Sequence, residues 1–167
     1  VTIGNAIVAY DSPQAPSVIA HEMSHLIFNE FMETARPELT WLNEGLAVCM
    51  ERKSYSAEQQ LAYENTCASA LQYGTVPLQT LMISSPAKQE RQGAQAWYCQ
   101  ANSVVSYLLD KGGGIGFSVL ANKLKTGSSF NDAVFIAYNG QWPDLPTFER
   151  GWLATSGARP NGGPAIN

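Results

Sequence analysis

The chain is poor in charge, and its few basic residues are scattered. Only ten of the 167 residues are Lys or Arg, charged residues make up 14%, and the formal net charge is −4. Without a basic cluster the chain lacks the electrostatic footprint of a protein that binds nucleic acid or an anionic membrane. Its apolar stretches end well short of the roughly 20 residues that a membrane-spanning helix needs, so no membrane span is expected. The low charged fraction favours a secreted or periplasmic protein.

Cysteine and histidine are also scarce. Three cysteines allow at most one internal disulfide, which we expect between Cys67 and Cys99 and which would leave Cys49 as a thiol. No Cys-x-x-Cys spacing occurs, so a zinc site made of cysteines has little support. The only two histidines are His21 and His25.

The length fits a single domain with a core of its own. We expect one catalytic domain over residues 1–156 and a flexible tail over residues 157–167, which are rich in Gly and Pro. The chain does not begin with Met, which suggests a processed or excised piece, so the absence of a signal peptide says nothing about the compartment.

The two histidines belong to the run His-Glu-Met-Ser-His at residues 21–25. If residues 19–28 are helical, His21 and His25 lie on one face and can bind one metal ion. Glu22 sits about 100° further round the helix, which suits work on a metal-activated water better than ligation. Catalytic zinc usually takes three protein ligands, so a carboxylate or a cysteine must complete the set. Glu44, in a second helix-like run, is the first candidate downstream.

The two motifs together resemble those of the gluzincin zinc metallopeptidases, the MA-like group that includes the M1-type aminopeptidases. Glu44 follows His25 after eighteen residues and lies in the run Trp-Leu-Asn-Glu-Gly-Leu-Ala. The resemblance implies that His21, His25 and Glu44 bind one zinc ion and that Glu22 is the general base. It also implies a zincin-like catalytic domain of the α+β class, mostly helical, with a short N-terminal β edge and a helical C-terminal lobe.

The resemblance extends beyond the zinc motifs. Residues 6–10 look like the edge strand that precedes the active-site helix in this family. Residues 98–108 are similar to the helix that brings a tyrosine to the substrate carbonyl, which implies that Tyr98 hydrogen-bonds the developing oxyanion. The alternative for Tyr98 is simple packing, and Tyr107 lies on a similar path.

One feature of the M1-type aminopeptidases has no counterpart here. They carry a Gly-x-Met-Glu-Asn segment before the edge strand, and its glutamate holds the amino terminus of the substrate. The first five residues of this chain include no acidic residue. We therefore expect an endopeptidase, or a peptidase of unspecified type, rather than an aminopeptidase.

The sequence thus predicts a zinc-dependent metallopeptidase that acts on a peptide or protein substrate. The alternative is a catalytically weak gluzincin-like module with a binding or structural role, and a histidine pair in the core without metal is a third interpretation. Glu51 lies two turns beyond Glu44 and either supports the metal site or, in the favoured interpretation, pairs with nearby lysines on the surface. Asn43 is a candidate for orienting a ligand or the substrate.

Periodicity and capping signals predict the remaining elements. We expect a first helix that begins near Pro16 and is buried on most sides, a second capped by Thr40, and a third opened by a capping box of Ser56 and Gln59. The other expected elements are a strand over residues 2–10, an extended connection over 76–81, and helices over 95–110 (stopped by residues 111–114), 117–125, 130–138 and 146–154.

Overall fold

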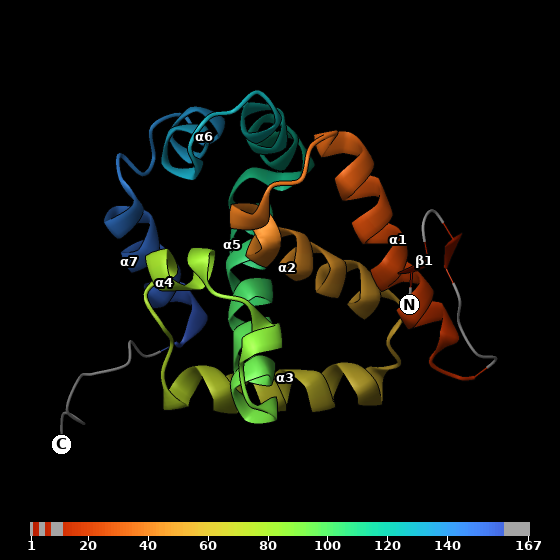
Figure 1. Cartoon of the computed structure of the whole chain (residues 1–167). Coiled ribbons are helices and arrows are strands. Elements are labelled where there is room, and N and C mark those ends of the chain that lie inside the picture. The colour runs from red at the N-terminus through yellow and green to blue at the C-terminus, as the bar shows by residue number, and fades with distance from the viewer. Residues whose placement is uncertain (1, 4–5, 8–11, 159–167) are drawn as a thin grey trace, which may run out of the picture.

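Helices make up nearly all of the structure, a computed structural model that describes residues 2–3, 6–7 and 12–158. Figure 1 shows α5 running through the middle of the molecule, with α2 crossing it, α1 and α7 on opposite sides, and α3 beneath. The elements are β1 (Thr2–Ile3), β2 (Ala6–Ile7), α1 (Ala15–Met32), η1 (Pro37–Leu39), α2 (Thr40–Glu51), η2 (Arg52–Ser54), α3 (Ala57–Tyr73), α4 (Leu78–Ile83), η3 (Pro86–Lys88), α5 (Arg91–Lys125), α6 (Phe130–Ala137) and α7 (Leu145–Ser156).

The predicted α+β class with an N-terminal β edge is wrong, although the predicted helical character is right. β1 and β2 are two residues long and form a minimal antiparallel pair with each other, with Thr2 opposite Ile7. Elsewhere in the described residues all regular elements are helical, so there is no larger sheet that this pair could edge. β propensity largely reflects packing on a sheet, and among the described residues β1 and β2 have no larger sheet to pack on. Residues 8–10 of the expected strand lie outside the described residues.

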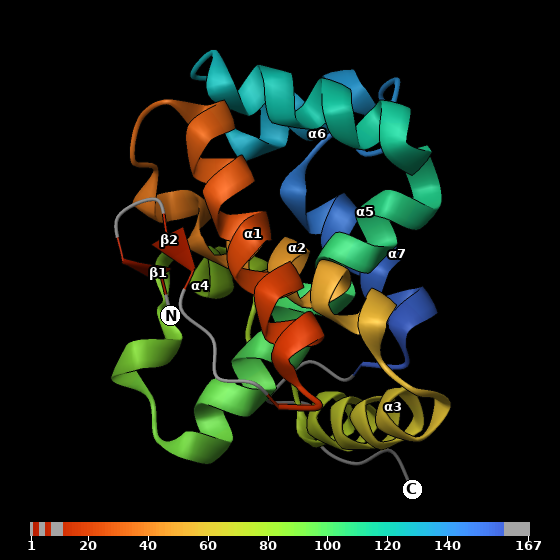
Figure 2. The ribbon, with the colours of Figure 1, turned by 90° about the vertical axis from the view of Figure 1, so that its right-hand side faces the viewer.

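The helix that carries the two histidines is less buried than predicted. α1 begins with Pro16 in its first turn, as expected, and buries Ser24, Phe28 and Met32. Met23 and Ile27 are 48% and 65% exposed, so the prediction of burial on most sides is wrong. Their face opens on an apolar cavity of about 630 Å³ between α1, α2 and the second half of α5. Figure 2 shows α1 lying on the outside of the molecule, with α2 behind it.

The glycine run in α5 changes the direction of the helix. Gly113 has a φ of 58° and a ψ of −165°, which are not helical values, and they kink α5 between two arms. Glycine adopts a positive φ without the steric cost that a Cβ would bring. The predicted stop at residues 111–114 is therefore this kink, and the helices predicted on either side of it are the two arms of α5.

Two local predictions are wrong. Thr40 does not cap α2 but is its first residue, and its hydroxyl donates to the carbonyl of Pro37 at 2.8 Å. The expected extended connection is helical from Leu78 onward, because α4 buries Leu78 and Leu81 in the core. Pro77 favours an extended conformation, but proline is also common at the start of a helix.

The links to α3 follow the prediction. Ser56 and Gln59 form the expected capping box at its start. The expected disulfide between Cys67 and Cys99 is present and ties α3 to α5, while Cys49 is a free, half-buried thiol.

Among the described helices none is long and apolar enough to cross a membrane. Of the predicted tail, Ala158 is buried against the core, and residues 159–167 lie outside the described residues.

Candidate metal centre

Two helices bring three potential metal ligands together. His21 and His25 lie one turn apart on α1, and α2 presents Glu44 to both imidazoles. The Oε2 atom of Glu44 is 3.7 Å from Nε2 of His21 and 3.5 Å from Nε2 of His25. All three ligand atoms lie within 4.8 Å of one another, and all three residues are half-buried. The structure therefore juxtaposes the three residues that the sequence nominates as metal ligands.

The distances from Glu44 to the two imidazoles fit a shared zinc ion. Ligand atoms at about 2.0–2.1 Å from zinc, in tetrahedral directions, lie roughly 3.4 Å apart. The two distances between imidazole nitrogen and carboxylate oxygen are close to this value. Two imidazoles and one carboxylate are also a donor set of catalytic zinc sites, which keep a further position for water or substrate. The residues present thus suit the ion that the motifs imply.

The charges of the three groups are strongly coupled. Burial alone would lower the pKa of His21, but hydrogen bonds to Glu44 and Glu51 outweigh it and raise that pKa to about 9. The pKa of His25 is also raised, against the effect of burial, chiefly by Glu44 and Asn43. Burial would raise the pKa of Glu44, but the two imidazoles lower it to about 2. Glu44 is therefore a carboxylate throughout the ordinary pH range.

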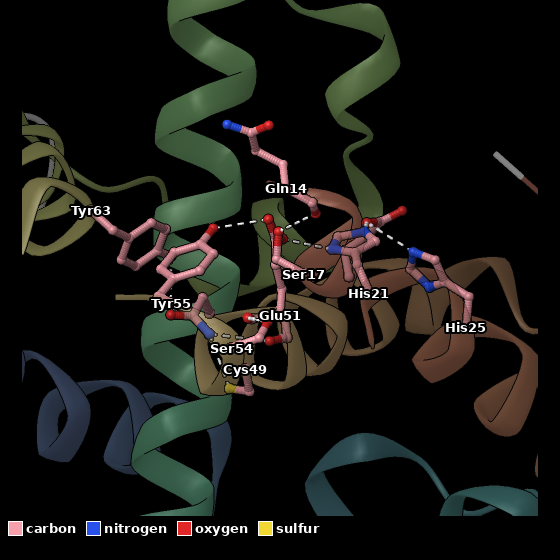
Figure 3. A network of polar contacts seen from close by, with 12 residues as sticks. Gln14, Ser17, His21, His25, Cys49, Glu51, Ser54, Tyr55 and Tyr63 are labelled. Atoms are coloured by element: carbon pink, nitrogen blue, oxygen red, sulfur yellow. Dashed lines mark hydrogen bonds and ion pairs between the residues drawn. The ribbon is translucent and has the colours of Figure 1, made fainter. Parts of the chain in front are cut away.

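A second layer of side chains holds each imidazole by its Nδ1 atom. Nδ1 of His21 lies 2.9 Å from Oε2 of Glu51, and Nδ1 of His25 lies 2.9 Å from Oδ1 of Asn43. An Nδ1–H that donates to an oxygen leaves the lone pair of Nε2 directed at the metal position. Figure 3 shows Glu51 on the side of His21 that faces away from His25.

Glu51 is in turn held by Tyr55. The hydroxyl of Tyr55 donates to Oε1 of Glu51 at 2.9 Å, so both carboxylate oxygens are engaged. The favoured prediction for Glu51, a surface partner of lysines, is wrong, and the alternative of support for the metal site fits the structure. Asn43, whose role the sequence left open, orients His25. Sequence reasoning missed Tyr55, which carries no motif and gains its position from the turn at η2.

Glu22 and Tyr98, the two other predicted site residues, lie on different helices. Glu22 follows His21 on α1 and is half-buried, about 100° round the helix from the ligand face. Tyr98 lies on the first arm of α5 and is half-buried, with its ring edge-on to Trp97. Burial and the nearby charge of Glu44 raise the pKa of Tyr98, so its phenol is a protonated donor. Tyr107, by contrast, is buried among the aromatic rings of Trp142 and Phe148.

Comparison with models of protein families gives a match over most of the chain. The model of a family described as the Peptidase MA superfamily matches residues 1–155, most of the chain. Neither curated proteins nor solved structures include a significant match to the chain.

Proposed function

Because the chain belongs to the Peptidase MA superfamily, we propose that it is a zinc-dependent metallopeptidase that hydrolyses peptide bonds. The convergence of His21, His25 and Glu44 on one point carries this proposal. The two imidazoles share one carboxylate at their Nε2 atoms, and each has a separate oxygen partner at Nδ1. That arrangement is the one that orients ligands toward a metal.

The ligand set determines what the metal contributes. Bound zinc supplies a Lewis acid that makes a water molecule more acidic and polarises a carbonyl group. His21 and His25 bind through Nε2, and Glu44 adds a negative charge that offsets part of the charge of the ion. Glu51 and Asn43 keep the rings in the productive orientation, which lowers the reorganisation needed when substrate binds.

Glu22 and Tyr98 carry the proton transfer and the carbonyl contact. Glu22 takes a proton from the attacking water and returns it to the leaving amine, as a general base and then a general acid. The phenol of Tyr98 donates a hydrogen bond to the carbonyl oxygen of the substrate as negative charge develops on it. No histidine is left for that task, since both are ligands.

The substrate class is a peptide or protein, cleaved as by an endopeptidase or a peptidase of unspecified type. Disulfides persist in oxidising compartments, so the disulfide between Cys67 and Cys99 favours a secreted or periplasmic protein.

Cleavage of an internally quenched peptide library tests this function. Chelation should abolish cleavage by the wild type, and one equivalent of zinc should restore it. Glu22→Gln keeps the shape of the side chain but removes the base, so it should bind zinc normally and lose about 10²–10⁴-fold in kcat. The control is Glu30→Gln, an exposed residue of the same helix, which should match the wild type. Cleavage that survives chelation or Glu22→Gln would contradict the proposal, and zinc binding without any cleavage would indicate a binding module.

Tyr98 has a separate test. Tyr98→Phe removes only the hydroxyl and should lower kcat about 10²-fold while zinc affinity stays unchanged, because the phenol acts on the substrate. The control is Tyr73→Phe, whose ring is 92% exposed on α3. Turnover of Tyr98→Phe at the wild-type rate would remove Tyr98 from the mechanism.

A further inference from the structure

A single buried amide joins the helices around the metal centre. Asn102 lies on α5, and its side chain is buried. Its Nδ2 donates to the backbone carbonyl of Gly45 at 3.2 Å and contacts Sγ of Cys49 at 3.0 Å. Its Oδ1 accepts from Nη1 of Arg52 at 2.9 Å and from the hydroxyl of Tyr63 at 3.0 Å. Cys49 and Tyr63 are labelled in Figure 3.

Asn102 lies at a close contact between α2 and α5. A Cβ added to Gly45 would lie 2.6 Å from the carbonyl oxygen of Ala101 and 2.7 Å from Cγ2 of Val105. Only a glycine leaves room for so close an approach of two helix backbones. The hydrogen bond from Asn102 to Gly45 fixes how the two helices are aligned along their lengths at this contact.

The residues on either side of this contact belong to the metal centre. Gly45 directly follows the ligand Glu44, and Asn102 lies one helical turn after Tyr98. Arg52, held by the other end of Asn102, directly follows Glu51, the partner of His21. A shift of α2 along α5 would therefore move Glu44 and Glu51 relative to Tyr98.

We propose that Asn102 is a positioning residue that holds the ligand helix α2 in register with the Tyr98 arm of α5. This inference rests on the proposed function of the metal centre. Asparagine suits the task because one side chain offers both a donor and an acceptor. The donor end reaches α2, and the acceptor end reaches the η2 turn and α3.

Two substitutions separate positioning from simple stability. Asn102→Asp keeps the acceptor for Arg52 and Tyr63 but places a second oxygen against the carbonyl of Gly45. Asn102→Ser releases the same carbonyl without adding a charge, and it serves if the aspartate variant does not fold. The control is Ser103→Ala on the same arm of α5, which loses a hydrogen bond from Trp152 of α7 rather than a contact with α2.

The readouts are zinc affinity by competition with a chromophoric chelator, kcat and KM for one peptide, and stability in urea. Both Asn102 variants should bind zinc about 10-fold more weakly and lose about 10-fold or more in kcat, with KM within about twofold. Ser103→Ala should lose stability alone, with zinc affinity and kcat unchanged per folded molecule.

Two results would overturn the inference. If the wild type is active and both Asn102 variants match its zinc affinity and kcat per folded molecule, Asn102 is a stabilising residue only, and the proposed function stands. If the wild type binds no zinc, the proposed function fails and the positioning role of Asn102 fails with it.

Discussion

His21 and His25 are held by oxygen partners of different charge. Glu51 is a carboxylate that contacts Nδ1 of His21, whereas Asn43 offers His25 a neutral amide oxygen. A charged acceptor strengthens the hydrogen bond and makes the imidazole a more basic ligand. His21 should therefore contribute more than His25 to the affinity for the metal, and its partner should matter accordingly.

Glu51→Gln tests the contribution of the charged partner. The substitution keeps the size of the side chain but removes its charge, so zinc affinity should fall by about 10-fold. Tyr55→Phe should lower zinc affinity less, because the charge of Glu51 remains and only the hydrogen bond from the phenol is lost. Zinc affinity is measured by chelator competition, with Glu58→Gln, an exposed residue at the start of α3, as the control. An unchanged affinity in Glu51→Gln would show that the contact is incidental.

The metal-free protein should be most stable in mildly acidic solution. The pKa of His21 is raised to about 9 in the folded state, so its contribution is complete below about 6.5 and is lost as the pH rises through 9. The pKa of Glu44 is lowered to about 2, so its contribution is present above about 4.5 and is lost as the pH falls. Because these groups are partly exposed, each loss should be of order 1 kcal/mol.

Urea unfolding of the chelator-treated protein at several pH values measures this effect. The unfolding free energy should decline between pH 6.5 and 9 and again below pH 4.5. His21→Gln should flatten the decline on the alkaline side. A wild-type free energy that rises steadily from pH 6 to pH 9 would contradict the coupling of His21 to the two carboxylates.

The ligand residues could be predicted from sequence, whereas Asn43 and Glu51 were candidates whose roles the sequence left open or weighed wrongly. The spacing of His21 and His25 sets their shared face by helix geometry alone, and Glu44 follows from the family resemblance. Glu51 lies thirty residues from His21 in the chain, and their contact depends on how α1 packs across α2. Asn102 carries no sequence signal at all, because a buried amide is recognised by its partners and not by its neighbours in the chain.

At the scale of elements, the contact between α2 and α5 determines the geometry of the centre. α2 supplies Glu44 and Glu51, and the first arm of α5 supplies Tyr98. Gly45 permits the close contact between these helices. A glycine inside a helix lowers its intrinsic stability, so the packing it allows must compensate for that cost.

Gly45→Ala should damage this contact. The added methyl group would meet the backbone of Ala101 and should destabilise the protein by about 1–3 kcal/mol. The matched control is Gly114→Ala on α5, where a Cβ would meet nothing within 4 Å. Urea unfolding of both variants gives the comparison, and a Gly45→Ala variant as stable as the wild type would show that the helices separate at little cost.

Capping and periodicity predicted most helices, whereas burial and the strand were harder to predict. The capping box of Ser56 and Gln59 is a local signal and is confirmed. The burial of α1 and the folding of residues 78–83 depend on what packs against them, which propensity does not contain. The expected β edge was wrong for the same reason, since a strand needs a sheet beside it.

At the scale of the whole molecule, the described helices are arranged around α5. Two of them, α1 and α2, bring the three candidate ligands His21, His25 and Glu44 to one point. The disulfide between Cys67 and Cys99 and the bonds of Asn102 tie α3 and α2 to the same arm of α5. We expect this point to bind one zinc ion.

Elemental analysis of protein purified without added zinc and then given one equivalent tests that claim most directly. We predict one zinc ion per chain in the wild type and loss of that ion in both His25→Ala and Glu44→Ala, with the helical circular dichroism signal retained. A wild type that holds no zinc after this treatment, or variants that retain it fully, would contradict the three-ligand site and leave a helical protein that only resembles a metallopeptidase.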